Sequence, residues 1–511
     1  MKNIALFFGA GAEIAYGLPS GGKFALDIFR ENTEADKNKL REQIRKVDTT
    51  THYALWLPKD FENKRINAFS KTQYDSLVKG SLENKRYDII QYMKNFDINV
   101  RKIVSNIQMK ENNNINIDLI YEELTGKCVG DSNYGQRIAL NRILGDDLDQ
   151  VFSSDYFAVL LDLLLCERIS SSLKMNLLKI IRNILELLIG ALGEELTHRL
   201  NDGIFEKSPD IMDLFDDLGS IFSLDYNNSG MRGLELLIEH EIKDLSKINI
   251  GDKEDIIFQF GLRILEDIFS KALDYQNLID TNWRYIYHPN TDWTKFTKII
   301  IFLNTVQRYI KSLADKNIDK IDSGNGYYHD VKLLKNEFNI TGIGTSNYNI
   351  FIRDIIQEEV FFLNGCVDDC YDPYLNKIVT EEENKEKNHI LVPFLFTQSG
   401  IKPLTSVQMS KRYVALFDKF EKADIICVCG FSFNSDDGHI NGMFRELIDD
   451  KRKKVVILHY YDAENNKQEI KKTYRKKLRL NSVANIEIII VDDNRYDIEK
   501  KRLWFESLKD M

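Results

Sequence analysis

The spacing of apolar residues divides the chain into three stretches. Residues 4–8 form a short apolar run that ends at a glycine, the pattern of a buried strand followed by a turn. From about residue 75 to 315, apolar residues recur every three to four positions, which predicts helices. After residue 339 short apolar runs return, and helix-like segments lie between them. The strands that we expect cover residues 4–8, 340–345, 359–363, 390–396, 425–429, 455–460 and 486–491.

Strands that alternate with helices predict parallel strands with helices on both faces of the sheet. The expected fold class is therefore α/β, a Rossmann-like doubly wound parallel sheet that the first strand joins. In this arrangement residues 1–35 and 336–511 form one domain. Residues 36–335 are then a large, mostly α-helical insertion. We also expect helices at residues 23–32, 411–422, 440–448 and 467–478.

Composition and charge narrow the possible partners. Of 511 residues, 43% are hydrophobic and 29% charged, which is typical of a folded soluble protein, and the length suits two or three domains. The formal net charge of -10 would repel a phosphate backbone, so nucleic acid is not expected as a direct partner. Charged residues interrupt the most apolar later stretch, residues 177–192, and the chain opens on no leader pattern. We therefore expect a cytoplasmic protein without a membrane span.

The six cysteines form no regular framework. Structural zinc commonly needs two close ligand pairs, and only Cys366 and Cys370 form one, at a loose spacing. We expect reduced cysteines and no bound metal.

A glycine turn follows the first strand. Gly9 and Gly11 would let the backbone approach a pyrophosphate, and the amides of the next helix would add positive partial charge. No third glycine follows at the dinucleotide spacing, and Asp27 lies inside the first helix, not at a ribose anchor. An ordinary dehydrogenase is therefore disfavoured. A purely architectural turn is the alternative.

Four short segments together resemble the sirtuin family, specifically its divergent bacterial branch from anti-phage defence systems. They lie within residues 1–32 and 336–450 and make three matches, because the second segment continues the first. All three matches have the family's order and lie at strand ends. The matching residues are Gly9, Ala10, Gly11, Ala12 and Glu13; Gly17, Leu18, Pro19, Ser20 and Gly21; Thr345, Ser346, Asn347, Tyr348 and Asn349; and Gly430, Phe431, Ser432, Phe433, Asn434, Ser435, Asp436 and Asp437.

The resemblance implies that the chain binds NAD and cleaves its bond to nicotinamide. In the defence relatives this hydrolysis empties the infected cell of NAD. Asn347 matches the family's catalytic Asn, which helps to place the attacking water and the nicotinamide ribose. The implied NAD-binding residues are Gly9, Ala10, Gly11, Glu13, Leu18, Pro19, Ser20, Thr345, Ser346, Asn349, Gly365, Gly430, Phe431, Ser432 and Asn434.

One departure affects catalysis directly. Where the family carries a catalytic His-Gly, this chain has Asn364-Gly365, and an amide cannot accept a proton at neutral pH. Asn364 can still hold a ribose hydroxyl. Our leading replacement for the catalytic base is His439, with His389 and His288 as alternatives, although each is also explained as a surface or hydrogen-bonded histidine.

Glu13 is a second departure, because it stands where the family has a small polar residue. A carboxylate there opposes phosphate binding if it points inward. It is instead expected to reach a ribose hydroxyl or to cap the following helix.

Three hypotheses follow from these patterns. The first is an NAD+ glycohydrolase effector of anti-phage (abortive infection) defence, which releases nicotinamide and ADP-ribose. Such an effector must stay inactive until triggered, so we expect a homo-oligomer, a partner protein, or both. The second is a catalytically silent sensor of NAD or ADP-ribose, which the missing histidine favours. The third is a scaffold that binds no nucleotide.

Overall fold

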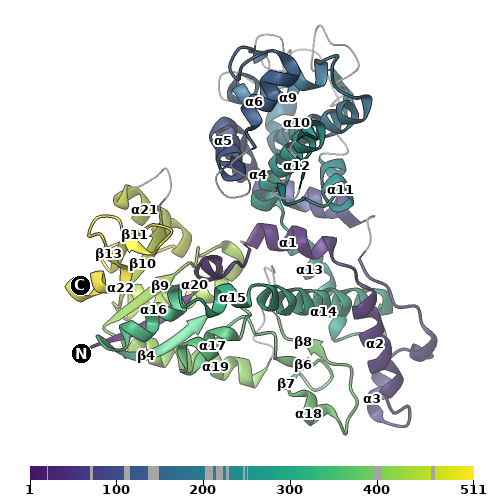
Figure 1. Cartoon of the computed structure of the whole chain (residues 1–511). Helices are drawn as coiled ribbons and strands as arrows, with labels where there is room; N and C mark the ends of the chain where they lie inside the picture. The colour runs from purple at the N-terminus through teal and green to yellow at the C-terminus, as the bar shows by residue number, and fades with distance from the viewer. Residues whose placement is uncertain are drawn as a thin grey trace. The chain divides into compact units, whose positions relative to one another are not determined.

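The computed structural model separates into two compact units (Figure 1). The first comprises Met1–Gly21, Glu31–Phe69 and Gln276–Met511, and the second Gly22–Arg30 and Ser70–Tyr275. These bounds differ from the expected 35/36 and 335/336, because helices on both sides of the insertion pack with the sheet-containing unit. The structure describes residues 1–19, 21–69, 73–108, 115–135, 149–201, 211–213, 223–225, 230–245, 248–249, 251–395, 406–461 and 466–511.

An eight-stranded, mostly parallel sheet forms the centre of the first unit. Its order is β13-β12-β11-β10-β9-β1-β4-β5, and only the pairings of β12 are antiparallel. The six parallel strands, numbered along the chain, have the order 3-2-1-4-5-6 known from Rossmann-type sheets. The expected α/β class with a parallel sheet is thus confirmed. The strands are β1 (Lys2–Phe8), β4 (Phe338–Thr345), β5 (Val360–Phe362), β9 (Ile425–Cys429), β10 (Lys454–Tyr460), β11 (Ile486–Val491), β12 (Tyr496–Asp497) and β13 (Arg502–Leu503).

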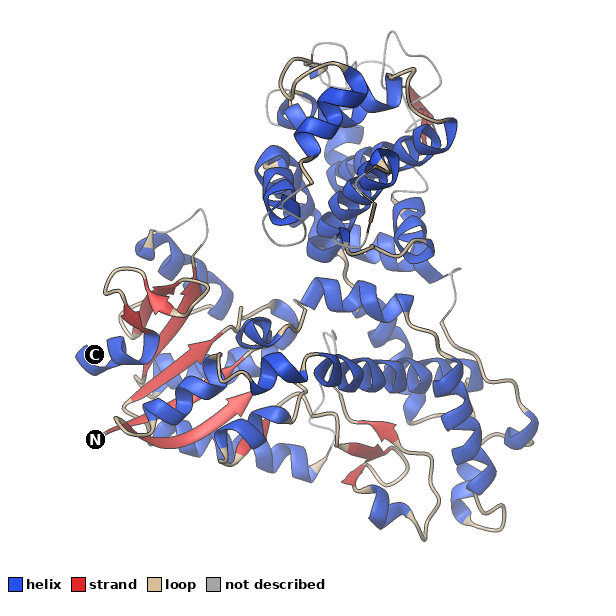
Figure 2. Cartoon of the chain, in the orientation of Figure 1, coloured by secondary structure: helices blue, strands red, loops and turns tan. Residues whose placement is uncertain are grey.

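Helices cover both faces of this sheet because its central strand is apolar on both sides. Ile4, Leu6 and Phe8 belong to one buried cluster, while Ala5 and Phe7 belong to the other. Figure 2 shows helices on both sides of the strands. The helices are α16 (Tyr327–Leu334), α17 (Phe351–Ile356) and α22 (Trp504–Ser507) on the first face, and α19 (Val407–Glu421), α20 (Gly438–Arg445) and α21 (Lys467–Leu478) on the second.

A second, three-stranded sheet corrects one prediction. A strand was expected at residues 390–396, of which the structure describes 390–395. Here β8 (Val392–Pro393) pairs not with the main sheet but with β6 (Cys370–Asp372), which also pairs with β7 (Lys377–Val379). Pro393 lacks an amide hydrogen, which suits a short edge strand. The other helices of this unit are η1 (Ala10–Tyr16), α2 (Glu34–Lys46), α3 (His52–Trp56), η2 (Phe61–Asn63), α13 (Gln276–Trp283), η8 (Arg284–Ile286), α14 (Trp293–Lys316), α15 (Ile318–Asp322), α18 (Glu381–Asn384), η9 (Ser435–Asp437), η10 (Glu446–Asp450) and η11 (Leu508–Asp510).

The second unit is built mainly from helices, as the apolar spacing predicts, plus one strand pair (Figure 2). Its longest helix, α10, packs against α4, α9 and α12, and side chains of α10 such as Ile180 and Ile184 are fully buried. No helix within the described ranges combines the length and hydropathy that a membrane crossing requires. The elements are α1 (Gly21–Arg30), α4 (Tyr74–Lys94), α5 (Phe96–Asn106), α6 (Ile117–Thr125), α8 (Asp149–Phe152), α9 (Asp155–Leu165), α10 (Ser171–Asn201), α11 (Met231–Glu239), α12 (Lys253–Ala272), β2 (Ile211–Asp213) and β3 (Ser223–Asp225).

Candidate functional site

The predicted motifs meet at the carboxyl ends of the central parallel strands. β1 lies between β9 and β4, and the chain order reverses between β1 and β9. Doubly wound sheets bind ligands in the crevice at this reversal. The turns after β1, β4, β5 and β9 therefore define the candidate site.

The two glycine turns contact each other through their backbones. The Gly9 amide donates a hydrogen bond to Cys429 O at 2.9 Å, and the Gly11 amide donates to Gly430 O at 2.9 Å. A Cβ on Gly9 would lie 2.6 Å from Gly430 O. Gly430 has φ 66°, and a Cβ there would overlap the amide nitrogen of Ala12. Close approach of two turns thus explains these glycines without a ligand.

This contact occupies backbone amides of the first turn that were expected to bind a phosphate. The amides of Gly9, Gly11 and Ala12 already donate to protein carbonyls. The helix after the turn is the 3-10 helix η1, and α1, which was expected to supply amides, belongs to the other unit. Phosphate binding here would need other donors.

Asn347 is fixed by hydrogen bonds at the end of β4. Its Nδ2 donates to Gly9 O and to Tyr328 Oη, both at 3.0 Å. Its backbone amide donates to Thr345 Oγ1, which itself donates to Phe8 O, each at 3.0 Å. Since a carbonyl can only accept, the amide orientation is determined. Oδ1 is then the side-chain atom left to accept a further hydrogen bond.

Glu13 points into the protein rather than toward a ligand. Its carboxylate accepts from Tyr328 Oη at 2.9 Å and from Asn349 Nδ2 at 2.8 Å. Burial raises the pKa of Glu13 from 4.5 to about 7, although the hydrogen bonds from Asn349, Tyr328 and Asn347 lower it. In this structure the partners of the Glu13 carboxylate are thus Tyr328 and Asn349 rather than a helix end, and Glu13 is a buried acid with a raised pKa.

Tyr328, at the start of α16, connects Glu13 with Asn347. This residue was not predicted from the sequence. Its hydroxyl lies between Glu13 and Asn347, and its backbone amide donates to Tyr16 Oη at 3.0 Å. The rings of Tyr16 and Tyr328 stack at 5.3 Å. Burial holds the pKa of Tyr328 well above its usual range, so the hydroxyl remains a donor. No motif or spacing marks Tyr328, because it lies in the expected insertion.

Asn364 and His439 form a second group beside the first. His439 Nε2 lies 3.1 Å from Asn364 Oδ1. Asn364 Nδ2 donates to Ser346 O at 3.5 Å and to Asp437 Oδ1 at 3.4 Å. Asn364 is buried and His439 half-buried. The leading replacement histidine thus contacts the residue that occupies the expected histidine position.

These contacts also set the tautomer of His439. Ser346 O can only accept, so Nδ2 of Asn364 faces it and Oδ1 faces His439. Nε2 must then carry the hydrogen, and in the neutral ring Nδ1 holds the basic lone pair. The ring also lies 5.4 Å from that of Tyr413, whose buried hydroxyl has no hydrogen-bond partner among the described residues. Sequence reasoning did not find Tyr413.

Other predicted residues fall into three environments. The side chains of Leu18 and Phe431 are buried in the two apolar clusters. Gly365 is buried, and a Cβ there would overlap Phe394 O. Ala10, Ser432 and Asn434 are exposed, Pro19 and Ser346 are half-buried, Thr345 and Asn349 are buried, and Ser20 lies outside the described residues.

The alternative histidines lie elsewhere. His389 Nδ1 is 2.7 Å from Asp372 Oδ2, and its ring stacks on Tyr53 at 3.9 Å. His288 follows η8, where its backbone amide donates to Tyr285 O at 3.2 Å. Among the described residues, no hydrogen bond joins either histidine to Asn347, Tyr328 or Glu13. Within the described ranges, no three His, Cys, Asp or Glu side chains gather as metal ligands.

Comparison of the sequence with models of known protein families found no match, and comparison with curated proteins found none either. The fold and the geometry of the site are therefore the basis for a functional proposal.

Proposed function

We propose that this chain binds NAD+ at the carboxyl edge of its parallel sheet and hydrolyses the bond to nicotinamide, releasing ADP-ribose. The observation that carries this proposal is the hydrogen bond between His439 and Asn364, beside the loop that presents Asn347. It supplies an ionisable group next to the position where the resemblance implies a histidine.

In this proposal each group has a distinct task. Asn347 Oδ1 accepts from the nicotinamide ribose or the attacking water, because both hydrogens of its amide are already donated. When the C–N bond breaks, its electron pair neutralises the cationic nicotinamide, so the leaving group needs no proton. Water forms the new C–O bond and loses a proton, which His439 accepts.

The pyrophosphate would lie on the exposed rim after β9. Because the Gly9 and Gly11 amides are engaged, the side chains of Ser432 and Asn434 are our proposed donors there. The cellular role that we propose is that of a cytoplasmic effector of anti-phage defence, controlled by self-assembly or a partner protein. This part rests on the sirtuin resemblance.

Incubation of the purified full chain with NAD+, followed by measurement of nicotinamide, tests the proposal. We expect release by the wild type and by the exposed control Asn481→Ala. Asn347→Ala should lower release about a hundredfold or more, because the ribose and water lose their positioning group. Thermal unfolding of each variant checks that the fold is retained. Absence of release by every oligomeric form, with and without phage components, would contradict the proposed hydrolysis.

A silent sensor of NAD or ADP-ribose is the second candidate, favoured by Asn364 at the expected histidine position. Calorimetry that detects NAD+ binding without nicotinamide release would support it. Gain of release by Asn364→His would then indicate a site that lacks only its base. If calorimetry detects no binding of NAD+, NADH or ADP-ribose, the scaffold hypothesis is the one that remains.

A further inference from the structure

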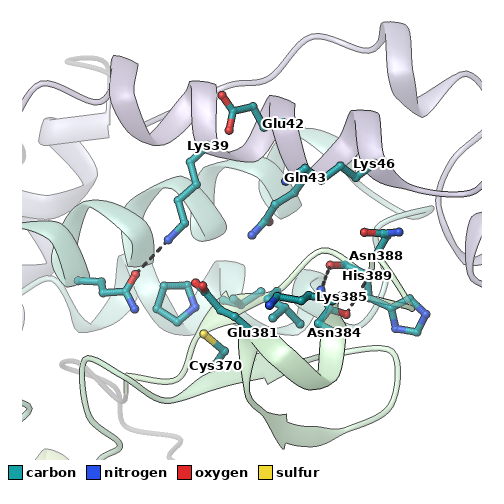
Figure 3. Close-up of a pocket in the computed structure, with 14 residues that line it drawn as sticks. Lys39, Glu42, Gln43, Lys46, Cys370, Glu381, Asn384, Lys385, Asn388 and His389 are labelled. Atoms are coloured by element: carbon teal, nitrogen blue, oxygen red, sulfur yellow. Dashed lines mark hydrogen bonds between the residues drawn. The ribbon is translucent and has the colours of Figure 1, made fainter.

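A cavity of about 490 Å³ lies between α2 and the three-stranded sheet (Figure 3). Pockets of this volume hold small molecules about as large as a mononucleotide. None of the residues that form the two groups around Asn347 and His439 lines it. It is a separate feature of the first unit.

Cationic side chains enter the cavity from opposite walls. Lys39 extends from α2, and Lys385 extends from the segment after α18; Lys46 lines one end. Lys385 pairs with the exposed Glu382, and Lys39 Nζ lies 3.2 Å from an amide oxygen. The lining thus contains three lysines and two glutamates, Glu42 and Glu381. Ammonium groups on facing walls suit a phosphate.

Uncharged side chains also line the cavity. Gln43 lines it from α2. Leu391, Val392 and Pro393 give the opposite wall an apolar surface that suits a flat ring.

We propose that this cavity is a second ligand site, which takes a phosphate-bearing molecule of about mononucleotide size. Its phosphate lies between Lys39 and Lys385.

A chain of hydrogen bonds connects this site to the loop that holds Asn347. Lys39 Nζ donates to Gln307 Oε1, and Gln307 Nε2 donates to Val367 O at 2.8 Å. The Val367 amide donates to Tyr348 O at 2.9 Å, next to Asn347. A phosphate that draws Lys39 away from Gln307 therefore acts on the loop. A regulatory effect on NAD+ cleavage rests on the proposed function.

Calorimetry with the full chain and AMP as probe tests the ligand site. We expect AMP to bind, and adenosine to bind about tenfold more weakly because it lacks the phosphate. Inorganic phosphate alone should bind weakly and compete with AMP. Lys39→Met and Lys385→Gln should each weaken AMP binding about tenfold, whereas the neighbouring Lys387→Gln, outside the cavity, should not. Lys39, Lys385 and Lys387 are exposed, so the fold should tolerate these substitutions.

No AMP binding, or AMP binding that both cavity variants leave unchanged, would overturn the proposal. Equal affinity for adenosine and AMP would overturn the assignment of the phosphate. These titrations need no NAD+ cleavage, so failure of the proposed hydrolysis would not affect them.

Hydrogen exchange tests the connection independently of NAD+. AMP should change exchange of the backbone amides in residues 345–349 and 363–367 of the wild type. Gln307→Met, which cannot bridge Lys39 and Val367, should still bind AMP but lose this change. Unchanged exchange in the wild type with AMP bound would overturn the connection.

Discussion

The candidate site has two halves, one around Asn347 and one around His439, which differ in the lengths of their hydrogen bonds and in burial. Around Asn347, the bonds to Glu13 and Tyr328 measure 2.8–3.0 Å and involve buried side chains. Around His439 and Asn364, they measure 3.1–3.5 Å, and the histidine is half-buried.

The difference indicates a division of tasks. A side chain that positions a substrate benefits from fixed neighbours, because its geometry is then set before binding. A side chain that accepts a proton must change its hydrogen bonding, which looser contacts permit. We infer that the Asn347 half positions and the His439 half reacts. Substitutions in the first should therefore cost stability as well as activity, and those in the second activity alone.

The largest stability effect is expected from the buried acid. Burial raises the pKa of Glu13 from 4.5 to about 7, so the folded protein holds this proton more tightly than the unfolded chain. The resulting stability is fully present below pH 4.5 and is lost as the pH rises through 7. The shift corresponds to on the order of 3 kcal/mol. Urea unfolding of the wild type and Glu13→Gln across this range measures it.

The difference in unfolding free energy between wild type and Glu13→Gln cancels the titration of all other groups. It should fall by about 3 kcal/mol between pH 4.5 and about pH 8. The Asn349 amide can turn to accept from the new glutamine, so the variant should fold. A difference that does not vary with pH would show that Glu13 has an ordinary pKa.

Tyr328→Phe should have the next largest effect on stability. It removes the donor to Glu13 and the acceptor for Asn347, and leaves two buried groups with one partner fewer. We expect the unfolding free energy to fall by about 2 kcal/mol. Tyr87→Phe, at a tyrosine that is 72% exposed, is the matched control and should be neutral. If both substitutions changed the unfolding free energy equally, the inference that the Asn347 half is tightly held would be wrong.

The sheet could be predicted from the sequence because its strands are continuous apolar runs. Residues 425–429 and 486–491 coincide with β9 and β11, and residues 467–478 with α21. The apolar run at 390–396 has the same appearance, but its Val392 and Pro393 enter the small sheet. Apolar spacing predicts a buried strand, whereas the choice of sheet depends on distant partners such as β6.

The site was only partly predictable for a similar reason. Asn347, Asn364 and His439 come after strands of a parallel sheet, so the topology predicts that they lie at the same, carboxyl edge of the sheet. Tyr328 comes from a helix before β4, and only tertiary packing brings it to Glu13. The glycine motif was also ambiguous, because a close backbone contact and a phosphate both require glycine. Here the backbone contact between Gly9 and Gly430 is observed.

His439→Gln should have the smallest effect on stability and a selective effect on activity. Glutamine can still donate from Nε2 to Asn364 Oδ1, but it cannot accept a proton at neutral pH. We expect the unfolding free energy to change by less than about 0.5 kcal/mol. Nicotinamide release should fall by about tenfold to a hundredfold, because the proton acceptor is lost. Full activity of this variant would assign His439 only a positioning role. A loss of stability as large as that of Tyr328→Phe would remove the distinction between the two halves.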